Sequence, residues 1–326
     1  MSEYEKIVTH NDFDGVVSAA IVSRALGIDR FVFAGPRTIV ESRVTITKND
    51  VVCDLPYPLE CGLWFDHHEG NLEELKYRGI DPASVPGRFA PRDSCARVVY
   101  EYFDPQVDLP KFLATTVDEA DVLDSFKFSS VEDWRRETPG KVVDAAIKAQ
   151  DGKPRERDAF LRALVRLLRD HPLAEVAARE DIREAYQRYR QREEEMLQVI
   201  ERDASFLPAD KARELVVLDL TGHKFPPRLV KKLAFLLYPD AKAVLEIKNI
   251  FRNGVKSTDL SVSMSLGISL SNVEHSKDVG EIMRALNIGD GHRGAGAGTV
   301  FCSSKAEMLK AKDRLLKEIY EIWTKQ

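Results

Sequence analysis

Acidic and histidine side chains follow three short apolar runs in the first part of the chain. Residues 7–9 lead into His10, Asp12 and Asp14, residues 51–53 lead into Asp54, and residues 63–65 lead into Asp66, His67 and His68. If each run is a strand of a parallel sheet, the carboxyl ends of the strands lie along one edge, which is where open sheets bind ligands. Four aspartates and three histidines would then meet in one crevice.

So many carboxylates at one edge repel one another unless a counter-charge is present. Carboxylate oxygens and imidazole nitrogens together suit divalent manganese, magnesium, iron or zinc. Two such ions about 3.5–4 Å apart can hold both the attacking and the leaving oxygen of a phosphoryl displacement, and can lower the pKa of a water to give a hydroxide. A single aspartate after a strand, such as Asp54, is more often a turn or helix-cap residue. The joint occurrence at three strand ends therefore carries the prediction of a two-metal phosphoesterase site.

The elements that must position these residues alternate in the order of a parallel α/β fold. Residues 7–9, 31–33, 51–53 and 63–65 have the pattern of short buried strands, and residues 16–26, 94–103 and 113–123 have helical periodicity. This βαβ order predicts a parallel sheet with helices on both faces.

Beyond residue 130 the composition changes. Residues 155–202 are dense in Arg, Glu, Leu and Ala, which predicts two long helices broken near His171-Pro172. Their charge runs fit solvated faces stabilised by Glu–Arg pairs. A second mixed unit follows, with strands expected at 215–220, 243–250, 260–266 and 299–302 and helices at 227–238, 279–286 and 304–323. The expected domains are 1–130, a helical connector at 131–210, and a smaller mixed α/β domain at 211–326.

Composition excludes several classes of protein. The 326 residues are 44% hydrophobic and 31% charged, with a formal net charge of −5. These values fit a globular protein and argue against one that coats duplex nucleic acid through bulk charge. The four cysteines form no Cys-x-x-Cys pair, and no apolar run has a signal-peptide or membrane-helix pattern. We expect a protein that stays off the membrane, in a reducing cytoplasm; a homodimer is left open.

These residues resemble the DHH phosphoesterase superfamily, which is named for an Asp-His-His motif like Asp66-His67-His68. The segment His10-x-Asp12-x-Asp14-Gly15, with Ser18, resembles the first motif of that family, and Asp54 fits the second. Residues 291–296, Gly-His-Arg-Gly-Ala-Gly, resemble the glycine-rich motif of the DHH-associated C-terminal domain. The resemblance implies a Rossmann-like DHH domain joined to that substrate-binding domain.

The resemblance also implies a role for each residue. His10, Asp12 and Asp54 look like ligands of one metal, and Asp14, Asp54 and His67 look like ligands of the other, with Asp54 bridging. Asp66 would orient a ligand imidazole, and His68 would stand beside the substrate phosphate as a hydrogen-bond donor or leaving-group acid. Two acids fit the fourth motif, Asp121 and Asp124, of which we favour Asp121 slightly. Manganese is the usual metal of the family; magnesium or another divalent cation would also suit the ligands.

The glycine-rich segment is interpreted as a phosphate or nucleotide clamp, because glycines let backbone N–H groups approach an anion closely. Its candidate substrate-binding residues are Gly291, His292, Arg293, Gly294, Ala295 and Gly296. Many relatives place an arginine in the strand that matches residues 260–266, where this chain has serines. The anion contact is therefore either missing in this chain or supplied from elsewhere, with Arg228 and Arg252 as the candidates.

The resulting hypothesis is a two-metal phosphohydrolase that acts on short oligonucleotides or on small nucleotides such as 3′-phosphoadenosine 5′-phosphate, in the manner of nanoRNases and pAp phosphatases. Alternatives are an exopolyphosphatase or a cyclic-dinucleotide phosphodiesterase. A non-catalytic nucleotide-binding regulatory module on the same fold is a further alternative. Loss of a metal ligand would mark that last class, and the first three motifs are intact.

Overall fold

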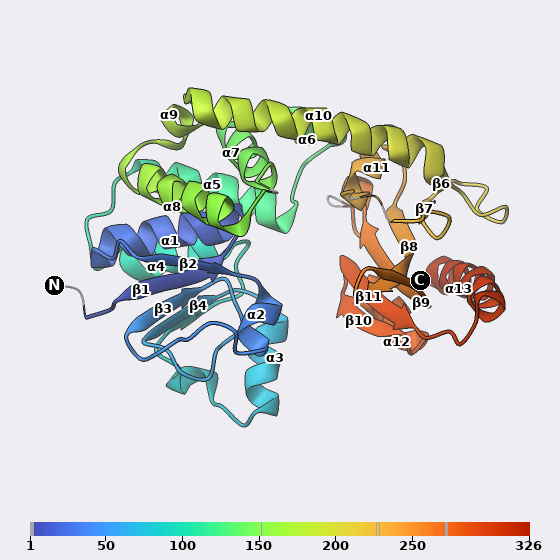
Figure 1. Cartoon of the computed structure of the whole chain (residues 1–326), viewed down its shortest axis with the longest axis horizontal. Helices are drawn as coiled ribbons and strands as arrows, with labels where there is room; N and C mark the ends of the chain where they lie inside the picture. Colours follow the sequence, from blue (N-terminus) through green and yellow to red (C-terminus); the bar gives the residue numbers. More distant parts are fainter. Residues whose placement is uncertain (1–2, 151, 226, 228, 271–272) are drawn as a thin grey trace. The chain divides into compact units, whose positions relative to one another are not determined.

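The structure, a computed structural model, describes residues 3–150, 152–225, 227, 229–270 and 273–326. Contacts within the chain group it into two compact units. Unit 1 comprises residues 1–127 and 137–190, and unit 2 comprises residues 128–136 and 191–326. The residues expected to form a helical connector are thus divided between the two units (Figure 1).

Unit 1 is built on a five-stranded sheet, called sheet A, with the strand order β2-β1-β3-β4-β5. Every pairing in it is parallel, so the expected parallel sheet is confirmed. Its strands are β1 Lys6–His10, β2 Phe31–Ala34, β3 Asp50–Cys53, β4 Leu63–Asp66 and β5 Gly87–Phe89. The strands β1, β3 and β4, which carry the candidate ligands, are direct neighbours.

Helices cover both faces of sheet A (Figure 1). One face packs Ile7, Val51 and Phe65 against the helices α1, α4, α5, α7 and α8, and the opposite face packs Val8, Val52 and Trp64 against α2 and α3. Strands that are buried on both faces have no polar alternation, which is why they read as continuous apolar runs. These helices are α1 Phe13–Leu26, α2 Pro36–Val40, α3 Glu69–Tyr77, α4 Cys95–Phe103, α5 Phe112–Ser125, α7 Pro139–Lys148 and α8 Pro154–Asp170, with a 3₁₀ turn η1 at Pro82–Ser84.

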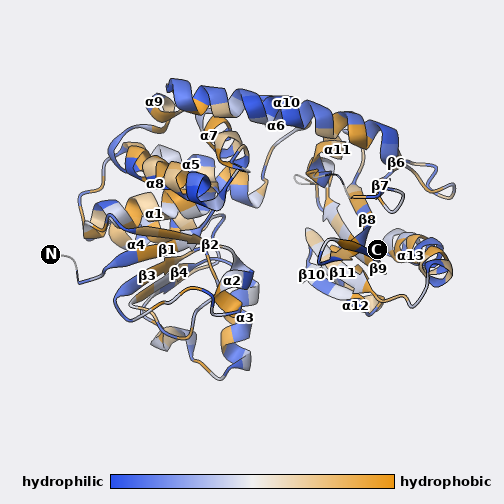
Figure 2. Cartoon of the chain, viewed as in Figure 1, coloured by the Kyte–Doolittle hydropathy of each residue, from blue (hydrophilic) through white to orange (hydrophobic). Residues whose placement is uncertain are grey.

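The segment at 155–202 forms three helices where two were predicted. After α8 come the short α9 Leu173–Ala178 and the long α10 Glu180–Asp203. The break expected near His171-Pro172 is present, because proline has no N–H to continue a helix. A second break falls at Arg179, which has an extended backbone. In Figure 2, α10 is coloured largely as hydrophilic residues.

Unit 2 is built on a six-stranded mixed sheet, called sheet B, with the order β10-β11-β9-β8-β7-β6. Among the strands that the structure describes here, only β7 and β8 pair in parallel. Its strands are β6 Ala204–Ser205, β7 Leu215–Asp219, β8 Ala243–Arg252, β9 Val255–Leu266, β10 Gly289–His292 and β11 Ala295–Val300. The predicted mixed α/β character of this part is confirmed.

Unit 2 contains the helices α6 Val131–Arg135, α11 Ala234–Leu237, α12 Val279–Ala285 and α13 Lys305–Lys325, with 3₁₀ turns η2 Lys231–Leu233 and η3 Ile268–Leu270. Helices of unit 2 pack on both faces of sheet B: α12 and α13 on one face, and α11 with the turn before it on the other. The expected helix at 227–238 is wrong in extent: η2 and α11 cover only 231–237, and Val230 is extended. Pro239 ends the helix, because a residue before proline disfavours the helical region. Within the described residues, no helix has the length and apolarity needed to cross a membrane.

Candidate metal centre

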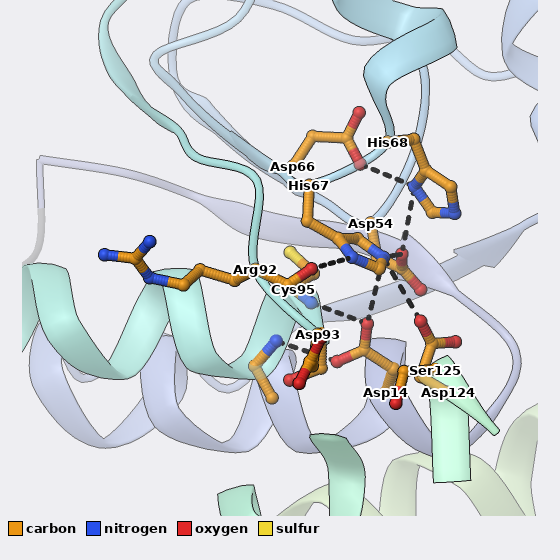
Figure 3. Close-up of polar contacts among 12 residues, drawn as sticks. Asp14, Asp54, Asp66, His67, His68, Arg92, Asp93, Cys95, Asp124 and Ser125 are labelled. Carbon is orange, nitrogen blue, oxygen red and sulfur yellow. Dashed lines mark hydrogen bonds and ion pairs between the residues drawn. The ribbon is translucent and has the colours of Figure 1, made fainter. Parts of the chain in front are cut away.

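The carboxyl ends of β1, β3 and β4 place their polar residues side by side. His10 is the last residue of β1, Asp54 directly follows β3, and Asp66 ends β4. Parallel neighbours end at one edge, so the residues that follow each strand converge there. Figure 3 shows Asp14, Asp54, His67, His68 and Asp124 directed towards one another at this edge.

The turn between β1 and α1 presents two carboxylates in fixed positions. Asp12 is the N-cap of α1 and accepts a hydrogen bond from the N–H of Gly15 at 3.0 Å. A Cβ atom at Gly15 would lie 2.4 Å from the carbonyl oxygen of His10, so the turn is this tight only with glycine. His10 Nδ1 lies 2.6 Å from an oxygen of Asp12 and 3.5 Å from an oxygen of Asp54. Three candidate ligands are therefore in mutual reach.

Asp14 is held by the first turn of α4, which sequence reasoning did not find. Its two carboxylate oxygens accept the backbone N–H groups of Cys95 and Ala96, each at 2.7 Å. Free N–H groups at a helix start stabilise a negative charge. Backbone donors of this kind leave no side-chain signal in a sequence. Ser94, the N-cap of α4, was the available hint that a helix begins there.

Asp54 adopts a backbone conformation that is unusual for a residue with a side chain. Its φ angle is 57°, in the left-handed region, while its N–H donates to the carbonyl oxygen of Phe65 at 3.0 Å. The residue is 2% exposed, and neither carboxylate oxygen has a hydrogen-bond partner among the described residues. Strained backbones and unsatisfied buried acids persist where function requires them.

His67 is oriented by a backbone carbonyl. Its Nδ1 lies 3.0 Å from the carbonyl oxygen of Arg92, which can only accept, so Nδ1 carries the proton. The lone pair on Nε2 is thereby free for a metal. Nε2 lies 3.3 Å from Asp124 and 3.7 Å from both Asp14 and Asp54 (Figure 3). It is buried and has no hydrogen-bond partner in the described part of the chain.

Donor atoms at this edge gather into groups that could each hold a cation. One group is His10, Asp12 and Asp54, a second is Asp14, His67 and Asp124, and a third is Asp54, His67 and His68. Asp54 and His67 each belong to two groups, and the unpartnered buried atoms are the two oxygens of Asp54 and Nε2 of His67. These hard oxygen and imidazole donors fit divalent cations, which would satisfy the atoms that the protein leaves bare.

Burial and mutual repulsion perturb the acids of this centre. Burial, and then the neighbouring carboxylates, raise the pKa values of Asp14 and Asp54 well above the ordinary range. Burial raises the pKa of Asp124 although the nearby histidines oppose it. The pKa of Asp12 is lowered, because its contacts with His10 and Gly15 outweigh its burial. For Asp14, Asp54 and Asp124, the protein alone thus disfavours the charge that they would need as metal ligands.

Asp66 contacts His68 rather than the candidate ligand His67. It is fully buried and accepts from Nδ1 of His68 at 2.8 Å and from the amide of Asn71 at 2.7 Å. Burial lowers the pKa of His68, but the bond to Asp66 outweighs this and the net pKa is raised. The side chain of His68 is 51% exposed, so its ring can meet a ligand. The orienting partner of His67 is the carbonyl of Arg92, which the sequence could not indicate.

The structure separates the two acids of the fourth motif, which lie on α5. Asp124 joins the centre through its 3.3 Å approach to His67. Asp121, which the sequence favoured slightly, instead accepts from Ser94 at 2.6 Å and from Nε of Arg97 at 2.8 Å. It belongs to none of the candidate metal groups of the described residues. The geometry therefore favours Asp124 as the ligand and Asp121 as a support of the start of α4.

This difference gives a paired prediction. Asp124→Asn is expected to weaken binding of the metal and to lower hydrolysis by about 10–100-fold or more, since even partners outside the ligand set cost that much. Asp121→Asn keeps a hydrogen-bond acceptor for Ser94 and is expected to cost less than Asp124→Asn. Titration of each metal-free variant with Mn²⁺ measures the difference. A larger loss of Mn²⁺ affinity in Asp121→Asn would reverse the assignment.

The glycine-rich segment forms a hairpin, not an irregular loop. β10 pairs with β11; His292 is the last residue of β10, and Arg293 and Gly294 form the turn. The N–H of Gly294 donates to Nδ1 of His292 at 3.1 Å, so a neutral ring carries its proton on Nε2, which is free to donate. Arg293 donates to the backbone carbonyls of Lys277 and His275.

Packing also explains part of the glycine content. A Cβ atom at Gly280, on α12, would lie 2.3 Å from the carbonyl oxygen of Gly291, and one at Gly296 would lie 3.0 Å from the side chain of Met283. The hairpin and α12 therefore touch through glycines. Of the two candidate arginines, Arg252 pairs with Asp259 at 2.7 Å, and Arg228 lies outside the described residues.

No protein-family model and no curated protein sequence matches this chain. Its structure is similar to that of the pGpG-specific phosphodiesterase PggH from Vibrio cholerae, with a TM-score of 0.73, 21% identity and coverage of 97% of this chain and 99% of that one. It is also similar to exonuclease RecJ bound to manganese, with a TM-score of 0.52, 13% identity and coverage of 97% of this chain and 90% of that one. A third similar structure is an exopolyphosphatase-related protein from Bacteroides fragilis, with a TM-score of 0.51, 11% identity and coverage of 99% of this chain and 94% of that one. These neighbours are DHH-family proteins, and the chain has their fold.

Proposed function

We propose that this protein is a two-metal phosphohydrolase. The observation that carries the proposal is the set of bare buried donor atoms, both oxygens of Asp54 and Nε2 of His67, at the place where the candidate ligand groups meet. Buried polar atoms are normally paired, so a set of unpaired buried acceptors at one point supports a position where a cation would bind. Manganese is the proposed metal, supported by the RecJ neighbour that was solved with it.

In this proposal His10, Asp12 and Asp54 hold one ion, and Asp14, Asp54, His67 and Asp124 hold the other. Bound divalent ions would supply Lewis acidity to a phosphoryl group and lower the pKa of a water. The N–H groups of Cys95 and Ala96 fix Asp14, and the carbonyl of Arg92 fixes His67. Two of these supports belong to the first turn of α4 and the third to the segment just before it, so backbone groups orient Asp14 and His67.

His68 is proposed as the donor to the substrate or leaving group. Its Nδ1 is occupied by Asp66, which leaves the exposed Nε2 to face a ligand. The carboxylate that raises the pKa of His68 also keeps more of the ring protonated near neutral pH. Asp66 therefore acts through His68.

Asp66→Asn tests this assignment. We expect kcat to fall by about 10–100-fold, as for other supports of active-site histidines. Loss of the charge should also lower the pKa of His68, so the alkaline limb of the kcat–pH profile should move to lower pH. Steady-state kinetics from pH 5.5 to 9.5 with a saturating metal concentration measure both. A lower kcat with an unmoved alkaline limb would show that His68 is not the titrating donor.

The proposed substrates are short oligonucleotides, with linear dinucleotides first, and small nucleotides such as 3′-phosphoadenosine 5′-phosphate. Support comes from a neighbour that is a pGpG-specific phosphodiesterase and matches this chain from end to end. Unit 2, with the exposed His292, is proposed to contribute substrate binding. An exopolyphosphatase-related neighbour keeps polyphosphate as a second candidate.

The decisive experiment is a hydrolysis screen of the full chain with Mn²⁺. It compares pGpG, other di- to pentanucleotides, the adenosine bisphosphate, cyclic dinucleotides and polyphosphate, with bis-p-nitrophenyl phosphate as a generic diester. Fastest turnover of dinucleotides supports the proposal, whereas a preference for polyphosphate or cyclic dinucleotides would replace the substrate class. Absence of any hydrolysis, with tight nucleotide binding retained, would indicate a non-catalytic binding module.

A further inference from the structure

The turn of the glycine-rich hairpin is bound to residues 275–279, the segment that leads into α12 and that we call the anchor segment. The N–H of Val279 donates to the carbonyl oxygen of Arg293 at 3.0 Å. In the opposite direction, Nε of Arg293 donates to the carbonyl oxygen of Lys277 at 3.3 Å, and Nη2 donates to that of His275. Hydrogen bonds therefore run both ways between the turn and the anchor segment.

The guanidinium of Arg293 is placed for these contacts rather than for binding an anion. An arginine binds a phosphate or a carboxylate most strongly through two parallel donors on one edge, such as Nε and Nη2. In Arg293 both of these donors already meet backbone carbonyls. Burial, and then the charge of Arg293, lower the pKa of His275, so this neighbouring ring is neutral at pH 7 and does not repel the guanidinium.

The anchor segment is bound in turn to the end of α13. The amide of Gln326 pairs with the backbone of Asp278: Oε1 accepts from its N–H and Nε2 donates to its carbonyl oxygen, each at 3.0 Å. Nζ of Lys277 donates to the carbonyl oxygen of Trp323 at 2.5 Å and lies 4.4 Å from the centre of the Trp323 ring. An ammonium group at the C-terminal end of a helix is stabilised by the carbonyls that have no partner within the helix.

α13 is a fixed reference for these contacts, whereas the hairpin has little packing of its own. Trp323 and Ile319 are fully buried in the apolar core of sheet B, and Nε1 of Trp323 donates to Glu214 at 3.1 Å. By contrast, β10 is an edge strand of sheet B and all four of its residues are exposed. Two of the four are glycines, which have no side chain to pack. The position of the hairpin therefore depends on its contacts with the anchor segment.

We propose that Arg293 and Gln326 are positioning residues of the glycine-rich hairpin. Gln326 holds the anchor segment on α13, and Arg293 holds the turn on the anchor segment. His292, which precedes Arg293 at the end of β10, is thereby kept in place to meet a ligand. This role differs from the anion contact that the sequence suggested for Arg293. The inference rests on the proposed function only for the identity of the ligand that His292 meets.

Backbone amide exchange of the metal-free full chain, followed by NMR, tests these contacts without any ligand. The N–H of Val279 donates to Arg293, and the N–H of Leu266 donates to the carbonyl oxygen of Gly294 at 2.8 Å, so both report on the position of the turn. Gln326→Ala should speed their exchange by about 10-fold, the effect of losing about one hydrogen bond. Amides in the middle of β8 should keep their rates. Unchanged exchange at the two reporters, or an equal increase throughout β8, would overturn the proposal.

A second variant shows whether the two residues act through the same segment. Arg293→Ala should give the same pattern, and the double variant with Gln326→Ala should be little worse than either single one, because both contacts lie in series. Additive effects would overturn the proposal. The matched control is Lys325→Ala, an exposed lysine beside Gln326, which should exchange as the wild type does. If Arg293→Ala proves unfolded by circular dichroism, Ser276→Ala, which removes a hydroxyl that donates to the carbonyl oxygen of Gln326, must still speed exchange at the reporters.

Binding of pGpG to the metal-free protein, measured by calorimetry, separates a positioning role from a phosphate contact. Arg293→Ala and Gln326→Ala should each raise Kd by a similar factor, about 10-fold or less. Removing a side chain that neutralises a phosphate makes binding less sensitive to salt. Both variants should therefore keep the salt dependence of the wild type between about 50 and 200 mM. A weaker salt dependence in Arg293→Ala would make Arg293 a phosphate ligand. Absence of pGpG binding in the wild type would instead refute the proposed substrate, while amide exchange still decides the positioning role.

Discussion

Replacement of Asp54 by asparagine should abolish hydrolysis, with a loss of more than about 100-fold, because even residues outside the ligand set of a metal site cost 10–100-fold. Asp54 belongs to two candidate ligand groups, so its loss impairs both ion positions together. Both of its carboxylate oxygens are buried and have no hydrogen-bond partner, and this is true of no other described acid of the centre. Asparagine has nearly the same shape as aspartate but no charge, so the variant tests loss of metal binding without a change in packing. Hydrolysis of bis-p-nitrophenyl phosphate with Mn²⁺ measures the effect.

The same substitution is expected to stabilise the protein when metal is absent. Asp54 is buried beside Asp14 and other acids that raise its pKa, so its charge opposes folding. Removing that charge should raise the Tm of the metal-free variant above that of the metal-free wild type, while the increase in Tm on adding Mn²⁺ should shrink. Thermal melts with and without Mn²⁺ test this. Equal stabilisation of both proteins by Mn²⁺ would contradict the role of Asp54 as a ligand of either ion.

Metal removal should change how stability depends on pH. In the metal-free protein, the folded-state pKa values of Asp14, Asp54 and Asp124 lie above those of the unfolded chain. Protons therefore favour the folded state, a contribution that is complete below the unfolded pKa of about 3.9 and is lost as the pH rises through the raised folded values. Asp12 has a lowered pKa, so its contribution to stability is present above the unfolded pKa and is lost as the pH falls through the lower folded value. Metal-free protein should gain stability from these raised groups on going from pH 7 to pH 5.

Mn²⁺ should reverse that trend, because it needs the carboxylates ionised and competes with protons. At neutral pH, metal at about 100 times its Kd adds about 2.7 kcal/mol of stability, and this gain shrinks as the pH falls. Melting curves of stripped and loaded protein should therefore converge towards pH 5. Calorimetry in buffers of different ionisation enthalpy should also detect proton release on Mn²⁺ binding at pH 6. Parallel pH profiles and no proton release would show that these acids are not the ligands.

Much of unit 1 could be predicted from the sequence because its signals are local. The strands at residues 7–9, 51–53 and 63–65 read as apolar runs since both faces of sheet A are buried, and the structure confirms all three. A parallel sheet then places the following residues at one edge without further information. The convergence of the candidate ligands was therefore accessible, as was the general chemistry of a divalent cation site.

The errors fall where local and tertiary preferences compete. Proline near residue 227 suggested a helix start, but among the described residues of this segment only η2 and α11 are helical, and they bury Leu233 and Phe235 with Val244 of β8. The interpretation of the glycine-rich segment as a clamp said nothing of its backbone, which is a hairpin because it pairs with β9 and packs against α12. The long charged segment beyond residue 154 breaks once more than expected, at Arg179.

The sequence by itself determined which side chains could bind a metal, because residue type and strand end are properties of the chain. Only the tertiary structure decided how they are used. Asp121 and Asp124 are three residues apart on one helix, and their separation into a support and a candidate ligand depends on Ser94, Arg97 and His67, which other segments bring to them. The carbonyl of Arg92 and the N–H groups of Cys95 and Ala96 are common to every residue type. Backbone groups gain such a role only when folding places them beside a ligand, so the pattern of side chains in the sequence could not predict which backbone groups would orient the site.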